Sequence, residues 1–504
     1  MKPMDNFLDK TTMYRLVIYC LLALSAITLI GSLFGMVAYS PISLIFTLLF
    51  LLIISWATNN LFLSVFKIHS NLESVYVTAL ILFLIIPPAD NPQDFILLGW
   101  AAVLAEASKY IIAISKKHIF NPAAIAVVLT GILLGQPITW WVGTMFMNPF
   151  ILVSGLLIVW KIRRIELVLS FIAAATLTGL GFGIFNRSDL LQLSKQILLE
   201  SPLLFFAFVM LTEPLTTPPT RKLQVYYGTL VGFLFSPQLH IFSLYSTPEL
   251  ALVLGNIFSY FVSPKGKLIL PLKEKIQVAP DIFDFTFTLD RKIDFQPGQY
   301  MEWTIKHPNP DARGSRRYFT IASSPTEEDI TIGVRFYEKS SSYKKAMLAL
   351  QPGTEIMAGG LAGDFVLPKD PNIKLCFIAG GIGITPYRSM IKYLMDTKQI
   401  RSIILLYACI TPQEVVYEEI FDEARRVYGL RTVYFVDDVN NFPNWQGRVG
   451  HVDQSIIMAE VPDYLERSFY ISGPPAMVSA FKGVLTKMGV QTNKIKTDYF
   501  PGFA

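Results

Sequence analysis

The chain changes its pattern of apolar and polar residues near residue 265. Before that point, ten apolar stretches approach the roughly 20 residues that a helix needs to cross a bilayer. They lie at about 14–38, 40–66, 73–88, 94–115, 121–136, 147–161, 165–185, 196–213, 223–242 and 247–263. We therefore predict a membrane α-helical domain with ten transmembrane helices over residues 1–265. The first stretch is interpreted as a retained helix, because no small-residue cleavage site follows it.

Basic residues between the apolar stretches predict how this domain is oriented. An even number of helices places both termini on the same side of the bilayer. The loops on that side hold fourteen lysines and arginines, whereas the opposite loops hold only Arg187 and Lys195. Lysine and arginine accumulate in cytoplasmic loops. We therefore expect a multi-pass protein of the cell (inner) membrane, with both termini and the second half of the chain in the cytoplasm.

The ten stretches also contain a repeat. Residues 79–88 resemble residues 207–216 in their apolar run and proline break, and they belong to the third and eighth stretches. Asn121 and a proline open the fifth stretch, as Thr247 and a proline open the tenth. The members of each pair are five helices apart and so run in opposite directions. This pattern predicts an inverted repeat.

Proline-interrupted segments at matching places in inverted halves indicate a binding site, because freed backbone amides and helix N-termini face an interior ligand. The repeat predicts two such sites. The inner site would contain Asn121, Glu213, Thr216 and Thr217, and the outer site Pro87, Pro88, Asp90 and Thr247. The alternative is that these prolines only end helices. Glu106 is a further intramembrane acid, which is either functional or merely directed into the bundle.

Two segments of this half resemble a known family. Residues 120–124 (Phe-Asn-Pro-Ala-Ala) and 210–219 (Met-Leu-Thr-Glu-Pro-Leu-Thr-Thr-Pro-Pro) are similar to segments of two redox-pump subunits. These are the B subunit of the sodium-translocating NADH:quinone oxidoreductase and the D subunit of the Rnf complex. Both carry FMN on a threonine within an Asp-x-x-Ser-Gly-Ala-Thr segment, which residues 136–144 lack. The resemblance therefore implies a second flavin in the membrane domain, FMN or riboflavin, bound non-covalently.

Beyond residue 268 the chain changes to short alternating segments. Residues 282–289 (Ile-Phe-Asp-Phe-Thr-Phe-Thr-Leu) have the pattern of a strand. Similar segments, separated by turn residues, predict a small antiparallel β-barrel over residues 268–368. Further apolar strands alternate with helical stretches, and they lie at 374–379, 403–407, 432–435 and 468–471. They predict a doubly wound α/β domain over residues 369–504.

Two motifs in this half suit phosphate groups. Residues 380–386 (Gly-Gly-Ile-Gly-Ile-Thr-Pro) connect a predicted strand to a helix. Such a turn lets backbone amides approach a pyrophosphate, whose charge the helix dipole favours. Arg317 opens an Arg-Tyr-Phe-Thr segment, and the guanidinium fork can donate two parallel hydrogen bonds to a phosphate. Taken singly, each motif is also compatible with an ordinary loop or a solvated arginine.

Together these motifs resemble the ferredoxin–NADP reductase superfamily, in the same order, over residues 268–504. The resemblance implies FAD contacts by Tyr300, Arg317, Phe319, Thr320 and Gly363, with Arg317 on the pyrophosphate and Thr320 on flavin N5. It implies a nicotinamide nucleotide site formed by Gly380, Gly381, Gly383, Thr385, Pro386, Gly473 and Pro474. Thr320, Ser472 and Asp498 would be the catalytic residues, and Phe503 would shield the flavin.

Three departures or alternatives bear on this assignment. Members of the superfamily often have cysteine at the place of Ser472, although serine can still fix the nicotinamide pocket. Asp498 is alternatively an exposed acid near the end of the chain. Residues 408–413 lack the basic side chains expected to bind a 2′-phosphate, so NADH is favoured over NADPH as the nucleotide.

Composition narrows the chemistry further. Hydrophobic residues make up 52% and charged residues 16% of the 504 residues, outside the usual range of soluble proteins. Three cysteines cannot supply the four thiolates of an iron–sulfur cluster, and none of the five histidines is placed opposite another as a membrane haem requires. We therefore expect organic redox centres, with no iron–sulfur cluster, haem or other metal in this chain, and no nucleic-acid partner.

Three functions stay open. The first is an NAD(P)H-dependent flavin oxidoreductase that passes electrons through FAD and a second flavin across the lipid bilayer to an extracytoplasmic acceptor. The second is an NADH:quinone reductase that works at the inner face. The third is an ion transporter regulated by the FAD module.

Overall fold

The computed structural model of the protein describes residues 11–66, 72–114, 117–135, 138–242, 244–263, 267–290, 292–311, 314–439, 442 and 445–498. The chain forms two compact units, and the boundary between them lies between Lys267 and Leu268. The first unit is helical, and the second contains two six-stranded sheets.

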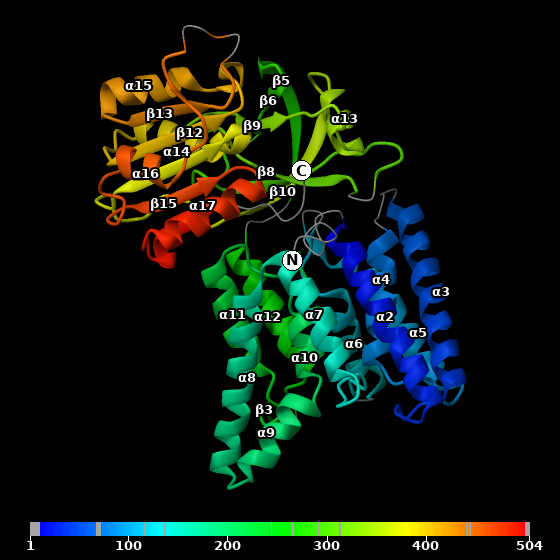
Figure 1. The fold of residues 1–504 in the computed structure, drawn as a ribbon. Coiled ribbons are helices and arrows are strands. Elements are labelled where there is room, and N and C mark those ends of the chain that lie inside the picture. Colours follow the sequence, from blue (N-terminus) through cyan, green and yellow to red (C-terminus); the bar gives the residue numbers. More distant parts are fainter. Residues whose placement is uncertain are drawn as a thin grey trace. The chain divides into compact units, whose positions relative to one another are not determined.

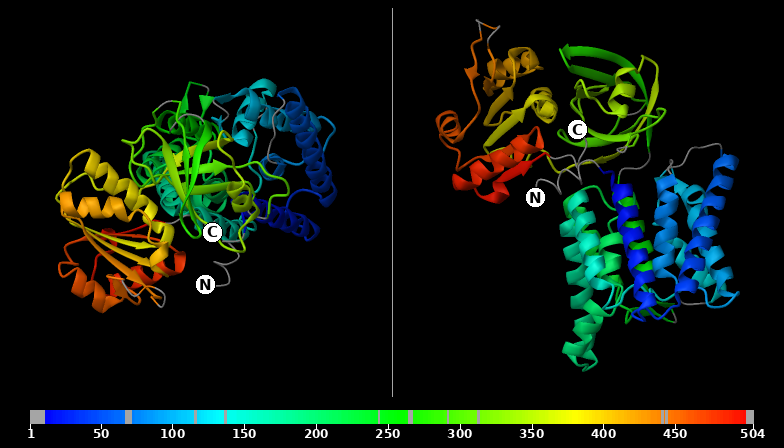
Figure 2. Two further views of the ribbon diagram at one scale, coloured as in Figure 1. Left: turned by 90° about the horizontal axis from the view of Figure 1, so that it is seen from above. Right: turned by 45° about the vertical axis from the view of Figure 1, so that its right-hand side comes forward.

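The first unit is a bundle whose helices stand side by side (Figures 1 and 2). Its helices are α2 (Met13–Leu33), α3 (Pro41–Phe66), α4 (Leu72–Ile85), α5 (Asp94–Ile111), α6 (Pro122–Leu134), α7 (Asn148–Ile162), α8 (Ile165–Phe185), α9 (Leu190–Leu199), α10 (Leu203–Phe205), α11 (Arg221–Leu234) and α12 (Pro248–Val262). A π-helical turn, Phe206–Met210, continues α10. Apolar side chains fill the interior of the bundle and also cover much of its outside, as on α3, where Ile42, Leu61 and Val65 are exposed.

Each of the ten predicted apolar stretches contains a helix, but the lengths of these helices differ. Among the described residues, α2, α3 and α8 are long and apolar enough to cross a membrane. A fourth span results if α9 and Leu203–Met210, which meet at 48°, are taken together. The eighth stretch is therefore not one continuous helix, since it breaks beside Pro202, which lacks a backbone N–H. Ten transmembrane helices stay a prediction.

The two halves of the bundle repeat the same neighbours. In the first half, α2 contacts α4, α3 contacts α5, and α5 contacts α6. In the second half, α7 contacts α10 and the π-helical turn, α8 contacts α11, and α11 contacts α12. A short hairpin precedes the last helix of each half, formed by β1 (Ala113–Ile114) with β2 (Lys117–His118) and by β3 (His240–Ile241) with β4 (Leu244–Tyr245). The contacts of the two halves thus correspond pairwise, which agrees with the repeat that the proline-interrupted segments predict.

The second unit begins with an antiparallel sheet. Its strands are β5 (Leu268–Ala279), β6 (Ile282–Phe287), β7 (Tyr300–Thr304), β8 (Arg316–Thr320), β9 (Ile330–Arg335) and β10 (Glu355–Ala362), in the order β8-β7-β10-β5-β6-β9. Ala322 N donates to Thr331 O at 2.8 Å, which joins the two edges of the sheet. Trp303, Phe285 and Phe287 fill the interior. The predicted antiparallel barrel is confirmed, and it also contains a short helix, α13 (Ser342–Leu348).

A parallel sheet completes the unit. Its strands are β11 (Leu375–Gly380), β12 (Ile403–Cys409), β13 (Arg431–Val436), β14 (Arg448–Val449), β15 (Ser468–Ser472) and β16 (Ile495–Thr497), in the order β14-β13-β12-β11-β15-β16. Helices α14 (Thr385–Asp396) and α15 (Glu418–Tyr428) cover one face, and α16 (Gln454–Glu460) and α17 (Pro475–Lys487) cover the other (Figure 1). The predicted doubly wound sheet is confirmed. Its strand order reverses between β11 and β15, and such a switch point is where these sheets bind ligands.

Candidate active site

The glycine-rich turn lies at the switch point of the parallel sheet. Strand β11 is fully buried, a 3-10 turn follows it, and α14 begins at Thr385 with a proline in its first turn. A Cβ on Gly383 would lie 2.5 Å from Ser472 O, and one on Gly380 would lie 2.2 Å from the sulfur of Met477. Side chains at these two positions would therefore clash with the turn after β15 and with Met477, so this close packing requires glycine. This backbone arrangement suits a pyrophosphate.

The turn after β15, which contains Ser472 and Gly473, packs against the glycine-rich turn. Ser472 pairs with Ala379 of β11, and Gly473 has a φ of +155° before α17 begins. Ser472 Oγ donates to Asp498 Oδ2 at 3.2 Å, and Asp498 N donates to Ile471 O at 2.8 Å. Asp498 is 7% exposed, so it is a buried partner of Ser472 and not an exposed terminal acid.

Cys409 lies against the glycine turn. It ends β12, and the backbone N–H of Gly381 partly offsets the effect of burial on the pKa of its thiol. Burial raises the pKa of the Cys409 thiol to about 12. The thiol is therefore protonated at neutral pH and packs as a neutral group beneath the turn.

The residues assigned to the flavin lie on two paired strands of the barrel. Tyr300 of β7 is opposite Thr320 of β8, and Met301 is opposite Phe319. A Cβ on Gly363 would lie 3.2 Å from the Tyr300 ring, and its φ of +121° favours glycine. Tyr300, Thr320 and Gly363 are thus brought together, and the aromatic ring of Tyr300 lies close to the backbone of Gly363.

Arg317 lies on β8 with its guanidinium buried. Its Nη1 donates to Gly314 O at 3.2 Å and to Arg316 O at 2.6 Å. The guanidinium also lies 3.6 Å from Asp311 and 4.9 Å from the centre of the Tyr343 ring on α13. Arg317 is opposite Trp303 of β7, and its buried, oriented guanidinium has the donors that a pyrophosphate requires. That it holds the FAD pyrophosphate stays a prediction.

Sequence reasoning missed the residues that surround Arg317. Ser342 N donates to Asp311 Oδ2 at 3.1 Å, while Asp311 N donates to Ser342 Oγ at 2.9 Å. His307 Nε2 lies 3.0 Å from the same Oγ. The only sequence signal for this group is Ser341, which caps α13 through Lys344 N. Phe503, which was assigned to the flavin, lies outside the described residues.

In the helical unit, three of the four predicted inner-site residues form one cluster. Thr216 Oγ1 donates to Glu213 Oε2 at 3.1 Å, and Thr217 Oγ1 donates to Glu213 O at 3.0 Å. His118 Nε2 lies 3.2 Å from Glu213 Oε1, and Arg164 donates to the Thr217 hydroxyl. No sequence motif marks His118 or Arg164 as members of this cluster.

The fourth residue, Asn121, caps α6 by accepting from Ala124 N at 3.1 Å. Its own backbone N–H donates to Asn256 Oδ1 at 2.8 Å, and Asn256 Nδ2 donates to Tyr227 OH at 3.0 Å. The start of α6 is thus bonded to α12 and, through it, to α11.

The residues of the predicted outer site are not joined by hydrogen bonds as those of the inner site are. The backbone N–H of Asp90 is bonded to Asp94 Oδ2 at 2.9 Å, and Thr247 caps α12 by accepting from Leu250 N. Asp90 and Thr247 are not hydrogen-bonded to each other. Among the described residues, no three His, Cys, Asp or Glu side chains gather as metal ligands would.

Part of the chain is similar to known oxidoreductases. Residues 377–483 match the family described as the oxidoreductase NAD-binding domain. The chain is 28% identical over 233 residues to the stachydrine N-demethylase reductase subunit of Rhizobium meliloti, covering 45% of this chain and 65% of that protein. It is 28% identical over 232 residues to the glycine betaine monooxygenase reductase subunit of Chromohalobacter salexigens, covering 45% and 62%. The chain thus spans less than two thirds of either relative.

Among solved structures, the cytochrome b5 reductase domain of Ulva prolifera nitrate reductase aligns with 47% of this chain and 98% of its own, at 22% identity and a TM-score of 0.42. The family match covers the glycine turn and the Ser472 turn, and the similarity to the two relatives is longer, at 233 and 232 residues. The second unit of this chain thus contains the matched NAD-binding domain, and it resembles these reductase subunits as an NAD(P)H-dependent flavin oxidoreductase module.

Proposed function

We propose that the chain is a membrane flavoenzyme that oxidises NADH through FAD and passes the electrons across the membrane, through a second flavin, to an extracytoplasmic acceptor. The observation that carries the first part is the meeting of the glycine turn, Ser472 and Asp498 at the switch point of the parallel sheet. FAD, when bound, accepts two electrons as a hydride and releases them singly.

In this proposal, different residues of the module bind FAD and NADH. Arg317 and Gly363 would hold the FAD pyrophosphate, and Thr320 would donate to flavin N5. The glycine turn would hold the pyrophosphate of NADH, while Ser472, fixed by Asp498, would orient the nicotinamide. Residues 408–413 contain no basic side chain, which favours NADH over NADPH.

The membrane assignment is supported by the apolar outside of the helical bundle and by the three or four helices that are long enough to span. The second flavin is assigned to the cluster of Glu213, Thr216 and Thr217 with Asn121, which combines buried hydrogen-bonding groups with a helix N-terminus. The three cysteines of this sequence are too few for the four thiolates of an iron–sulfur cluster. In this proposal, electrons pass from FAD to the second flavin of the helical domain.

Cofactor analysis of the detergent-purified protein tests the proposal. Acid precipitation separates free from covalent flavin, and chromatography identifies each species. FAD together with released FMN or riboflavin is the expected result. FAD alone would exclude the second flavin and favour the quinone reductase.

The acceptor is tested in sealed vesicles that enclose NADH on the side of the reductase module. Reduction of an impermeant oxidant on the opposite side supports electron export. Reduction of quinone alone would favour the inner-face quinone reductase. Ion flux without NADH would instead favour the regulated transporter.

A further inference from the structure

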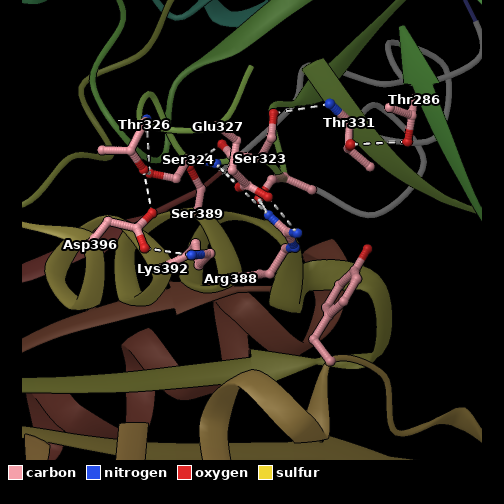
Figure 3. Close-up of polar contacts among 12 residues, drawn as sticks. Thr286, Ser323, Ser324, Thr326, Glu327, Thr331, Arg388, Ser389, Lys392 and Asp396 are labelled. Atoms are coloured by element: carbon pink, nitrogen blue, oxygen red, sulfur yellow. Dashed lines mark hydrogen bonds and ion pairs between the residues drawn. The ribbon is translucent and has the colours of Figure 1, made fainter. Parts of the chain in front are cut away.

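The β-barrel and the parallel sheet of the reductase module are joined by polar contacts that no sequence motif marks (Figure 3). Arg388 of α14 donates to both carboxylate oxygens of Glu327, at 2.7 and 3.0 Å, and to Ala322 O at 3.0 Å. Ser389 Oγ donates to Ser323 O at 2.7 Å. We call Arg388, Ser389, Glu327 and Ser323 the clamp.

Most of the clamp is shielded from solvent. Ser389 is fully buried and Ser323 is 1% exposed, while 14% of the Arg388 side chain is exposed. A two-pronged bond between guanidinium and carboxylate fixes direction as well as distance. Beside it, Thr326 Oγ1 donates to Asp396 Oδ2 at 2.5 Å, which ties the far end of α14 to the same loop of the barrel.

A second attachment lies on another strand pair of the barrel. Arg335 of β9 donates to both carboxylate oxygens of Glu414, at 2.9 and 2.7 Å. Tyr417 OH donates to Asp284 Oδ1 of β6 at 2.6 Å. Two attachments at separate places prevent one part of the module from rotating about the other.

The clamp residues lie close in sequence to the residues that would bind the flavin and the nicotinamide nucleotide. Ser323 follows Thr320, the residue assigned to flavin N5, by three positions, and Arg388 follows Thr385 of the glycine turn by three. Each side of the clamp is therefore within one short segment of a residue that would hold a reactant. Resting on the proposed function, we propose that the clamp sets the distance between flavin and nicotinamide, with Arg388 and Ser389 as positioning residues for hydride transfer.

Stopped-flow reduction of the bound FAD by NADH, in the detergent-purified full chain without oxygen, tests this role. In Arg388→Gln we expect the limiting rate at saturating NADH to fall about 10- to 100-fold, because small misplacements of reacting atoms are this costly. The FAD content and the NADH concentration at half-maximal rate should change little. Arg388→Lys should restore part of the rate, and Lys487→Ala, on α17 at the other face of the parallel sheet, should leave it unchanged.

A wild-type rate per bound FAD in Arg388→Gln would overturn the proposal, as would a loss of rate that only follows a loss of FAD. Ser389→Ala removes a single hydroxyl and repeats the test if Arg388→Gln does not fold. If NADH fails to reduce the wild-type protein, the proposed function itself is wrong. A wild-type rate in the variants, in contrast, would count only against the role of the clamp.

Discussion

Replacement of Arg317 by alanine should weaken the retention of FAD. The side chain is 2% exposed, and its guanidinium is already oriented by two backbone carbonyls, Gly314 O and Arg316 O. Little conformational entropy is therefore lost when it donates to a pyrophosphate. Alanine removes the charge and every donor at this position.

The magnitude follows from the bonds that are lost. A hydrogen bond to a charged group contributes about 1.5–3 kcal/mol. Loss of one such bond therefore weakens FAD binding about 10- to 150-fold, since each 1.4 kcal/mol is a factor of ten. Arg317→Lys should lie between the wild type and Arg317→Ala, because lysine keeps the charge but not the fork.

The assay is the ratio of FAD to protein after gel filtration, followed by titration of the depleted protein with FAD. Arg316→Ala is the matched control, since Arg316 is adjacent, is 31% exposed and lies 3.6 Å from Glu302. It should keep its FAD. A purified Arg317→Ala protein with stoichiometric FAD and unchanged affinity would refute the assignment of Arg317 to the pyrophosphate.

Four further outcomes are expected. Gly383→Ala should raise the NADH concentration needed for half-maximal flavin reduction at least tenfold without loss of FAD, because its Cβ would meet backbone atoms at 2.5 Å; an unchanged value would contradict the tight turn. Burial raises the pKa of Asp284 above its unfolded value of about 3.9, so the folded state holds the proton to higher pH and stability falls as pH rises through the folded pKa. Asp284→Asn should flatten this slope, measured by thermal release of FAD at increasing pH above about 4. Burial also raises the pKa of Cys376 and of Cys409, so neither thiol should react with a maleimide in the native protein, as mass spectrometry of labelled peptides would show. Glu213→Gln should lower the content of the second flavin while the FAD stays, and full retention of both would count against the inner site.

Much of the reductase module could be predicted from the sequence. The strands expected at 403–407, 432–435 and 468–471 are β12, β13 and β15, because strands buried on both faces are continuous apolar runs bounded by turns. The turn at 380–386 was equally clear, since close backbone packing there requires glycine. These features depend on short segments, which the sequence displays directly.

The clamp could not be predicted in the same way. Arg388 and Glu327 are 61 residues apart, and each has the appearance of a solvated charge on a surface segment. The partners of Arg317 on α13 were missed for the same reason. In the helical unit, the break at Pro202 was missed because the apolar composition continues through it, although proline cannot continue the hydrogen-bond ladder.

The bond between Asn256 and the backbone of Asn121 bears on how the helical unit is made. Asn121 precedes α6, whereas Asn256 lies in α12 and is translated 135 residues later. Until α12 arrives, a backbone N–H at the start of α6 lacks its acceptor, which is costly in an apolar surrounding. The start of α6 therefore completes its hydrogen bonds only after α12 has been made, and a nascent chain that stops before α12 should remain a substrate for quality-control proteases.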